Sequence, residues 1–347
     1  MNASRADEWR SRGGHFSWRP AEGDASPVEI FHVEMGDPSA PVVLLIHGWP
    51  TCSIDWFAVA ESLSAEFRVC ALDFPGYGFS DKREGWGYSL GRDAELIEFY
   101  LSKVVGAEAA VVVGHDRGDS VALIHAARCA EGRSSVRLEH LVLSNANIFL
   151  PLSNLTDAQR RILDKDSGPR IGTVLTAAQL AEGMGATTFT PPRKAGDPEV
   201  EALTATFAHN DGVMVLHETI QYLVERSQDE QKWLTALSGA PFPVTLIWGV
   251  YDTVSPPRVA SYVWNHYLML RPGGNRLYFI PDANHYLQLD RPDTFVKVLR
   301  HTLQAGDQQP PGPLDPELGA ALLVDASRER LPAAEDLLRG DGPTAVN

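Results

Sequence analysis

Short apolar runs alternate with helical patterns along most of this chain. Uninterrupted apolar runs of strand length are typical of strands covered on both faces, as in a parallel sheet. Residues 15–19 and 27–34 instead alternate between apolar and polar positions, which predicts an antiparallel pair joined by a turn at Glu22-Gly23-Asp24. The pattern therefore predicts an α/β fold with a mostly parallel, eight-stranded sheet flanked by helices. The other predicted strands are residues 41–46, 67–73, 111–113, 138–144, 243–249 and 276–280.

The alternation of strands and helices stops near residue 149 and resumes at residue 241. Between these points only helical patterns occur, and stretches rich in Pro and Gly break them. We therefore expect residues 1–148 to form the first part of the core, residues 149–240 an inserted helical domain, and residues 241–304 the second part of the core. Helices are predicted within the insertion at residues 158–163, 176–182 and 213–224.

Both ends of the chain differ in composition from the middle. Residues 1–13 are polar and predict no regular element. Residues 305–347 are rich in Pro, Gly and charged side chains, which predicts a disordered tail. A short helix over residues 317–324 or 333–338 is the most that the tail pattern suggests.

Composition narrows the class of protein. The chain has 347 residues with 44% hydrophobic content, enough for a full core, and a net charge of −15, which argues against nucleic acid or an anionic membrane as a partner. Its three cysteines lack C-x-x-C spacing, which is typical of thiols in a reducing compartment. Neither a signal pattern nor a membrane-length apolar run is visible, so we expect a cytoplasmic protein. No metal-ligand spacing or dinucleotide fingerprint occurs, and no metal or cofactor is expected.

The motif Gly114-His115-Asp116-Arg117-Gly118 joins a β-branched run to a helical pattern and places Asp116 at a sharp turn. Glycines on both sides suit a turn whose flanks would otherwise collide with the neighbouring strand and helix. The motif resembles the nucleophile elbow of the α/β-hydrolase superfamily in its aspartate branch, which contains epoxide hydrolases and haloalkane dehalogenases. The resemblance implies that Asp116 attacks a saturated carbon and forms an alkyl-enzyme ester; an aspartate is already ionised at neutral pH.

Three further segments resemble the same branch, in the same chain order. His47-Gly48-Trp49-Pro50 matches the oxyanion loop, which implies a hole formed by the backbone N–H groups of Trp49 and Arg117, with His47 shaping the loop. Asp252 follows residues 243–249 in a G-x-x-D pattern and matches the acid of a catalytic triad. His285 follows the last predicted strand and matches the base, for which Asp282 is the alternative acid partner.

Within the superfamily, the chain resembles the mesoderm-specific transcript proteins and their bacterial relatives. It rests on Gly114-His115-Asp116-Arg117-Gly118-Asp119, on Leu143-Ser144-Asn145, and on Asn210-Asp211-Gly212 followed by Gln221-Tyr222. The resemblance also implies that residues 149–240 form a cap over the elbow.

The resemblance implies epoxide hydrolysis as the leading function, with an epoxide and water as substrates. Relatives protonate the opening oxygen with two tyrosines of the cap, whereas residues 149–240 contain only Tyr222. His209 or His217 is the candidate for the second proton donor.

Two alternatives remain open. The same triad supports cleavage of a carbon–halogen bond, although haloalkane dehalogenases generally carry other residues at the positions of Trp49 and Arg117. Fluoroacetate dehalogenases do place Arg after the nucleophile, but their second Arg, three residues later, is replaced here by Ser120, which argues against a carboxylate clamp. A non-catalytic binding protein on the same fold is the other alternative. A homodimer is compatible with the sequence.

Overall fold

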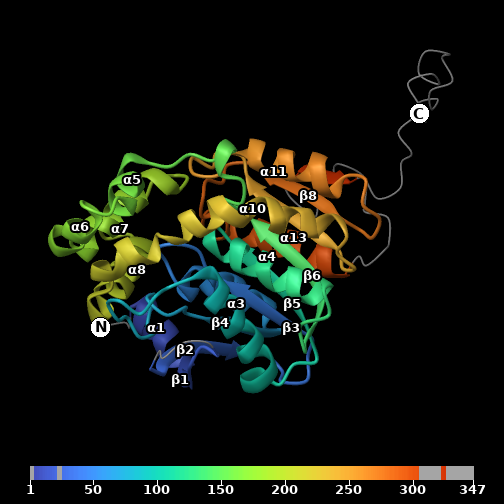
Figure 1. Ribbon diagram of the computed structural model, residues 1–347, viewed down its shortest axis with the longest axis horizontal. Helices are drawn as coiled ribbons and strands as arrows, with labels where there is room; N and C mark the ends of the chain where they lie inside the picture. The colour runs from blue at the N-terminus through green and yellow to red at the C-terminus, as the bar shows by residue number, and fades with distance from the viewer. Residues whose placement is uncertain (1–3, 22–25, 305–321, 326–347) are drawn as a thin grey trace, which may run out of the picture.

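The computed structural model describes residues 4–21, 26–304 and 322–325. Within these residues nine strands form one sheet in the order β1-β2-β4-β3-β5-β6-β7-β8-β9. Figure 1 shows the sheet with the helices packed around it. The strands are β1 (Gly13–Trp18), β2 (Val28–Met35), β3 (Val42–Ile46), β4 (Arg68–Leu72), β5 (Ala109–His115), β6 (Arg137–Ser144), β7 (Val244–Gly249), β8 (Arg276–Ile280) and β9 (Leu322–Asp325).

The sheet is parallel in its centre and antiparallel at both edges. β1 pairs with β2, β2 with β4, and β8 with β9 in antiparallel fashion, and the other neighbours are parallel. The carboxyl ends of β3, β5, β6, β7 and β8 therefore lie at one edge, where open α/β sheets generally build their sites. The predicted eight strands are confirmed.

The ninth strand is a correction to the predicted tail. Leu322–Asp325 pairs with β8, with Leu277 opposite Val324. The predicted short helix over residues 317–324 is therefore wrong at residues 322–324. Backbone pairing with an open sheet edge prevails there over a local helical pattern. The rest of residues 305–347, including the other predicted short helix, lies outside the described residues.

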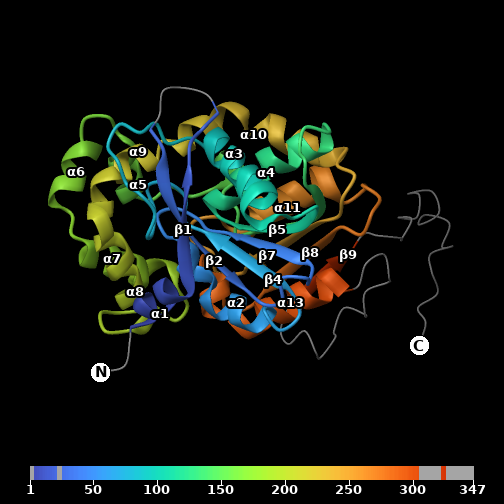
Figure 2. The same cartoon turned by 90° about the horizontal axis from the view of Figure 1, so that it is seen from below.

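Helices cover both faces of the sheet. α3 and α4 lie on one face, and α2 and α13 lie on the other (Figure 2). The core helices are α1 (Arg5–Arg12), α2 (Phe57–Leu63), α3 (Leu90–Phe99), α4 (Arg117–Ala130), α11 (Pro257–Val263), α12 (Leu287–Asp290) and α13 (Pro292–Gln304), with a 3-10 turn at Ser53–Trp56 and π-helical turns at Tyr100–Val105 and Trp264–Leu268. Within the described residues, no helix is both long and apolar enough to cross a membrane.

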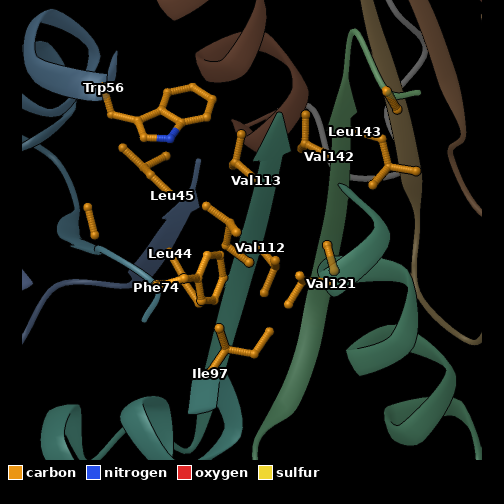
Figure 3. Close-up of a cluster of buried hydrophobic side chains, with 14 of the residues drawn as sticks. Leu44, Leu45, Trp56, Phe74, Ile97, Val112, Val113, Val121, Val142 and Leu143 are labelled. Atoms are coloured by element: carbon orange, nitrogen blue, oxygen red, sulfur yellow. The ribbon is translucent and has the colours of Figure 1, made fainter. Parts of the chain in front are cut away.

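The core is continuous across the middle of the sheet. Consecutive residues such as Val112 and Val113 on β5 are both fully buried, because each face of that strand is covered by helices. Figure 3 shows the side chains of β3, β5 and β6 packed against Trp56, Phe74, Ile97 and Val121 from the surrounding helices and loops. This packing fixes the strand ends that carry the candidate site.

A helical segment lies between β6 and β7, and its helices α5–α8 extend beyond the end of the sheet (Figure 1). The predicted helix over residues 213–224 is divided among a 3-10 turn, α9 and the start of α10. The segment comprises α5 (Asp157–Leu163), α6 (Gly168–Val174), α7 (Ala177–Thr188), α8 (Pro198–Ala208), α9 (Leu216–Thr219) and α10 (Tyr222–Ser238), with 3-10 turns at Leu150–Leu152 and His209–Val215.

The N-terminal stretch is not loose, contrary to the sequence-based expectation. The Ser4 side chain accepts the N–H of Asp7 and caps α1. Trp9 is fully buried, and its indole N–H donates to Ser53 Oγ at 3.0 Å. Arg5 pairs with Glu199 of α8 at 2.9 Å. One buried aromatic side chain thus anchors a helix whose average composition is polar.

We predict that Trp9→Ala lowers the free energy of unfolding by about 3–5 kcal/mol, the usual loss for a buried tryptophan. Chemical denaturation followed by circular dichroism measures the change. Trp9→Phe keeps the ring and loses the hydrogen bond, so its loss should be smaller, about 1–3 kcal/mol. A loss for Trp9→Ala below about 1 kcal/mol would mean that α1 is not part of the cooperative core.

Candidate active site

Asp116 occupies the turn between β5 and α4 with φ 50° and ψ −113°, a conformation that a non-glycine residue rarely adopts. The flanking glycines explain how the turn is tolerated. A Cβ on Gly114 would lie 2.2 Å from Asp119 Oδ1, and one on Gly118 would lie 2.6 Å from the carbonyl oxygen of His47. The sheet therefore presents the Asp116 carboxylate at the carboxyl end of its central strand.

The predicted oxyanion loop lies against this carboxylate. The backbone N–H of Trp49 donates to Asp116 Oδ2 at 2.9 Å. A Cβ on Gly48 would lie 2.8 Å from Cβ of Asp116, so glycine permits the close approach. Arg117 N is the next backbone nitrogen after Asp116 and opens α4.

His47 supports this loop from behind. Its ring is fully buried, and Nε2 accepts the backbone N–H of Phe74 at 3.1 Å. Burial lowers the pKa of His47 to about 3, so the ring is neutral near neutral pH. These contacts agree with the structural role that the resemblance implies for His47.

His285 connects the two predicted carboxylates. Its Nδ1 lies 3.1 Å from both Oδ1 and Oδ2 of Asp252, and its Nε2 lies 3.7 Å from Oδ1 of Asp116. Asp252 Oδ1 also accepts the backbone N–H groups of Val254 and Ser255 at 2.8 Å, which fixes that carboxylate. Folding thus brings together Asp116, Asp252 and His285 at the ends of β5, β7 and β8, although Asp116 and His285 are 169 positions apart in the chain.

The electrostatics of His285 follow from its two acidic neighbours. Burial alone would lower the pKa of His285, but the charges of Asp252 and Asp116 outweigh burial and raise it above its usual value. The adjacent His115 shows the opposite result, because burial and the nearby His285 lower the pKa of His115 to about 3. His285 is therefore the imidazole at this site that accepts a proton readily.

Asn145, at the end of β6, positions the His285 loop and was missed in the sequence analysis as a site residue. Its Nδ2 donates to the carbonyl oxygens of Asn284 at 2.7 Å and His285 at 2.6 Å, and its Oδ1 accepts the N–H of Gly249 at 2.8 Å. One side chain therefore joins the ends of β6 and β7 to the loop after β8. The signal in the sequence was an Asn directly after the predicted strand 138–144, since Asn tolerates the positive φ, here 44°, that such a strand end can require.

Tyr222 lies at the start of α10, is buried, and has two guanidinium groups close to its ring. Arg117 Cζ lies 5.6 Å from the centre of its ring, and Arg226 Cζ lies 4.9 Å from it. Burial and the charge on Asp116 raise the pKa of Tyr222 well above its usual value, so its hydroxyl keeps its proton. The inserted segment thus brings a buried hydroxyl into the electrostatic field of Asp116.

The other candidates have partners elsewhere. His209 stacks edge-on against Phe79 with ring centres 5.3 Å apart, and His217 Nδ1 lies 3.0 Å from the carbonyl oxygen of Met214. Asp282 is exposed, whereas His285 Nδ1 is held by Asp252. In the described part of the chain, no group of three His, Cys, Asp or Glu side chains is arranged to hold a metal ion.

The chain belongs to the alpha/beta hydrolase fold family, which matches residues 41–292. It is 31% identical over 298 residues to LipZ of Mycobacterium tuberculosis, whose name gives it as a candidate hydrolase, with 86% of this chain and 98% of LipZ covered. It is 29% identical over 301 residues to the mesoderm-specific transcript homolog protein of Homo sapiens, covering 84% of this chain and 85% of that protein. It is 27% identical over 286 residues to haloalkane dehalogenase 2 of Mycobacterium tuberculosis, covering 80% of this chain and 92% of that dehalogenase. These similarities confirm the predicted fold and family resemblance, and the chain is a hydrolase of this fold.

We predict that Asp252→Asn lowers the pKa of His285, because the substitution removes the negative charge that most favours the imidazolium form. The ring should then lose its proton at a lower pH than in the unaltered chain. Proton NMR titration of the His285 ring measures the change. Asp282→Asn is the matched control, since it removes an exposed carboxylate three positions from His285. An equal change in both variants, or none in Asp252→Asn, would contradict the Asp252–His285 pairing.

Proposed function

We propose that this hydrolase converts epoxides to vicinal diols through an ester formed on Asp116. The observation that carries the proposal is the position of the Asp116 carboxylate, with Oδ2 held by the N–H of Trp49 and Oδ1 near Nε2 of His285. An ionised carboxylate at this position needs no base to attack, unlike a serine. The proposal assigns nucleophile, acid and base to Asp116, Asp252 and His285.

In the first step, Asp116 Oδ1 attacks one ring carbon of the epoxide and the bond from that carbon to the ring oxygen breaks. Tyr222 donates its proton to the oxygen as it opens, which leaves a hydroxyalkyl ester on Asp116. Oδ2 stays beside the N–H of Trp49 and becomes the carbonyl oxygen of the ester.

In the second step, Nε2 of His285 takes a proton from water while the water oxygen attacks Cγ of Asp116. The negative charge develops on Oδ2, where the N–H groups of Trp49 and Arg117 form the proposed oxyanion hole. The bond from Cγ to the ester oxygen then breaks, and His285 gives its proton to the leaving alkoxide, which completes the diol. Asp116 is left as a carboxylic acid, and its proton passes through water to the Tyr222 phenolate formed in the first step, so that both side chains regain their starting forms. Asp252 orients the ring and stabilises its charged form.

The inserted helical segment acts as the cap in this proposal. It contacts the core near the site, where the Trp49 indole N–H donates to Thr219 Oγ1 at 3.1 Å and Lys82 Nζ donates to the carbonyl oxygen of His209 at 2.8 Å. A cap in this position excludes bulk water during ester formation and brings Tyr222 to the reacting oxygen.

Cleavage of a carbon–halogen bond is the second candidate, and the similarity to haloalkane dehalogenase 2 favours it. The same Asp116 attack would then release a halide without a proton donor. Against this route, the Trp49 indole N–H is engaged by Thr219 rather than free to hold a halide. Epoxide opening instead uses the buried hydroxyl of Tyr222.

We predict that His285→Gln accumulates the ester, because only the second step needs the base. The variant is incubated separately with styrene oxide, a bromoalkane and fluoroacetate, and intact-protein mass spectrometry followed by peptide mapping locates the adduct. An epoxide adds its whole mass to the Asp116 peptide, whereas a halide adds only its alkyl part. The double variant Asp116→Ala/His285→Gln is the control and should form no adduct.

Normal turnover by His285→Gln would remove His285 from the mechanism. An adduct from the bromoalkane or fluoroacetate alone would replace the epoxide assignment with dehalogenation. No adduct with any compound would refute the proposed activity towards these substrates and favour a binding protein.

We predict that Tyr222→Phe slows ester formation from styrene oxide by about 10²–10⁴-fold, the usual contribution of a general acid, and leaves the rate with a bromoalkane unchanged. Rapid-quench measurement in the His285→Gln background isolates the first step. Tyr251→Phe is the matched control, because Tyr251 is 53% exposed. Equal slowing with both substrates would mean that Tyr222 only packs the cap.

A further inference from the structure

Arg226 of α10 is fully buried and has no carboxylate within salt-bridge distance among the described residues. Its Nε donates to Ser120 Oγ at 2.8 Å and its Nη1 donates to the backbone carbonyl of Asn147. Nη2 is buried and has no hydrogen-bond partner within the described residues. A buried cation normally requires a compensating anion, and a hydroxyl and a carbonyl supply no net negative charge.

Further unpaired polar atoms surround this guanidinium. Asn147 is fully buried, and neither its Nδ2 nor its Oδ1 has a hydrogen-bond partner in the described part of the chain. Arg117 pairs with Asp93 through Nη2, but its Nε and Nη1 are likewise unpaired there. Buried polar groups are nearly always paired in folded proteins, so several unpaired donors around Tyr222 indicate a polar ligand.

Asp119 is an acidic side chain whose charge interacts with that of Arg226, but the two form no ion pair. Asp119 is fully buried and accepts the N–H of Ser144 at 3.1 Å through Oδ2. Burial and the nearby charge on Asp116 raise the pKa of Asp119 well above its usual value, which favours the neutral carboxyl form. Arg226 thus keeps a positive charge that no ion pair within the described residues offsets.

Arg226 lies close to Tyr222 and to the helix that follows Asp116. Tyr222 and Arg226 are four positions apart on α10 and face the same side, where the guanidinium lies over the tyrosine ring. Ser120, which Arg226 contacts, lies one helical turn after Asp116 on α4. α10 packs along α4, as Figure 1 shows. A substrate oxygen at Tyr222 and an anionic group at Arg226 can therefore belong to one small molecule.

We propose that Arg226, with Arg117 and Asn147, binds a carboxylate of the substrate, so that the substrate is a small epoxide bearing a carboxylate close to its ring. The epoxide part of this inference rests on the proposed function, whereas the carboxylate-binding part does not. Guanidinium groups match a carboxylate because each offers planar paired donors, and the Asn147 amide adds another donor. The charge of Arg226 also offsets the repulsion between that carboxylate and Asp116, whereas the charge of Arg117 is already paired with Asp93.

The test measures equilibrium binding, which needs no turnover. Phenylacetate and its neutral amide, phenylacetamide, are titrated by isothermal calorimetry into the full chain, into Arg226→Met and into Lys232→Met. Lys232 is an exposed cation on the same helix and serves as the matched control. We expect the unaltered chain and Lys232→Met to bind phenylacetate at least about tenfold more tightly than the amide, and Arg226→Met to lose that preference.

Equal affinity for acid and amide in the unaltered chain, or no binding of either, would overturn the proposal. So would a preference that survives in folded Arg226→Met. If circular dichroism shows that Arg226→Met is unfolded, Arg226→Lys is tested in its place. We expect Arg226→Lys to weaken phenylacetate binding by several fold, because lysine lacks the paired N–H donors of the guanidinium group. Sodium bromide competing as strongly as phenylacetate would indicate a free-halide site instead. If the chain binds phenylacetate more tightly than phenylacetamide but His285→Gln forms no adduct with styrene oxide, the anion site stands and the epoxide assignment is rejected.

Discussion

The carboxylate of Asp116 is a buried charge, and much of the surrounding structure compensates for it. Asp116 is 2% exposed, so water does little to solvate its negative charge. The N–H of Trp49, the ring of His285 and the N-terminus of α4 together replace that solvation. Each of these groups comes from a different strand end, which explains why the site depends on the register of the central sheet.

The same requirement explains the close backbone approaches around Asp116. The Trp49 N–H reaches the carboxylate only because Gly48 has no side chain, and α4 reaches β3 only because Gly118 has none. Asn145 then holds the His285 loop to the ends of β6 and β7. A rigid arrangement of this kind keeps the proposed nucleophile and base in place before a substrate arrives, which is the principal requirement for electrostatic stabilisation of a transition state.

Local pattern was sufficient to predict the parts of the fold and site that depend on neighbouring residues in the chain. The apolar runs identified the eight strands, and the glycine-flanked turn identified Asp116. The sequence did not reveal α1, because its stability depends on burial of Trp9 against Ser53, or β9, because it depends on pairing with β8. Contacts distant in sequence have no signature in a single chain.

The contact between Arg226 and Ser120 is another one that the sequence did not reveal, and it bears on which substrate the site can bind. From sequence, the serine at position 120 argued against a carboxylate clamp, because a second arginine was missing from α4. The structure places the guanidinium of Arg226 on that serine, 106 positions further along the chain. If the proposed carboxylate binds at Arg226, the helix that supplies the buried hydroxyl of Tyr222 also couples the position of the inserted segment to substrate charge. An anionic ligand would remove the desolvation cost of Arg226 only when α10 is seated on α4, so binding of such a ligand should favour the closed cap.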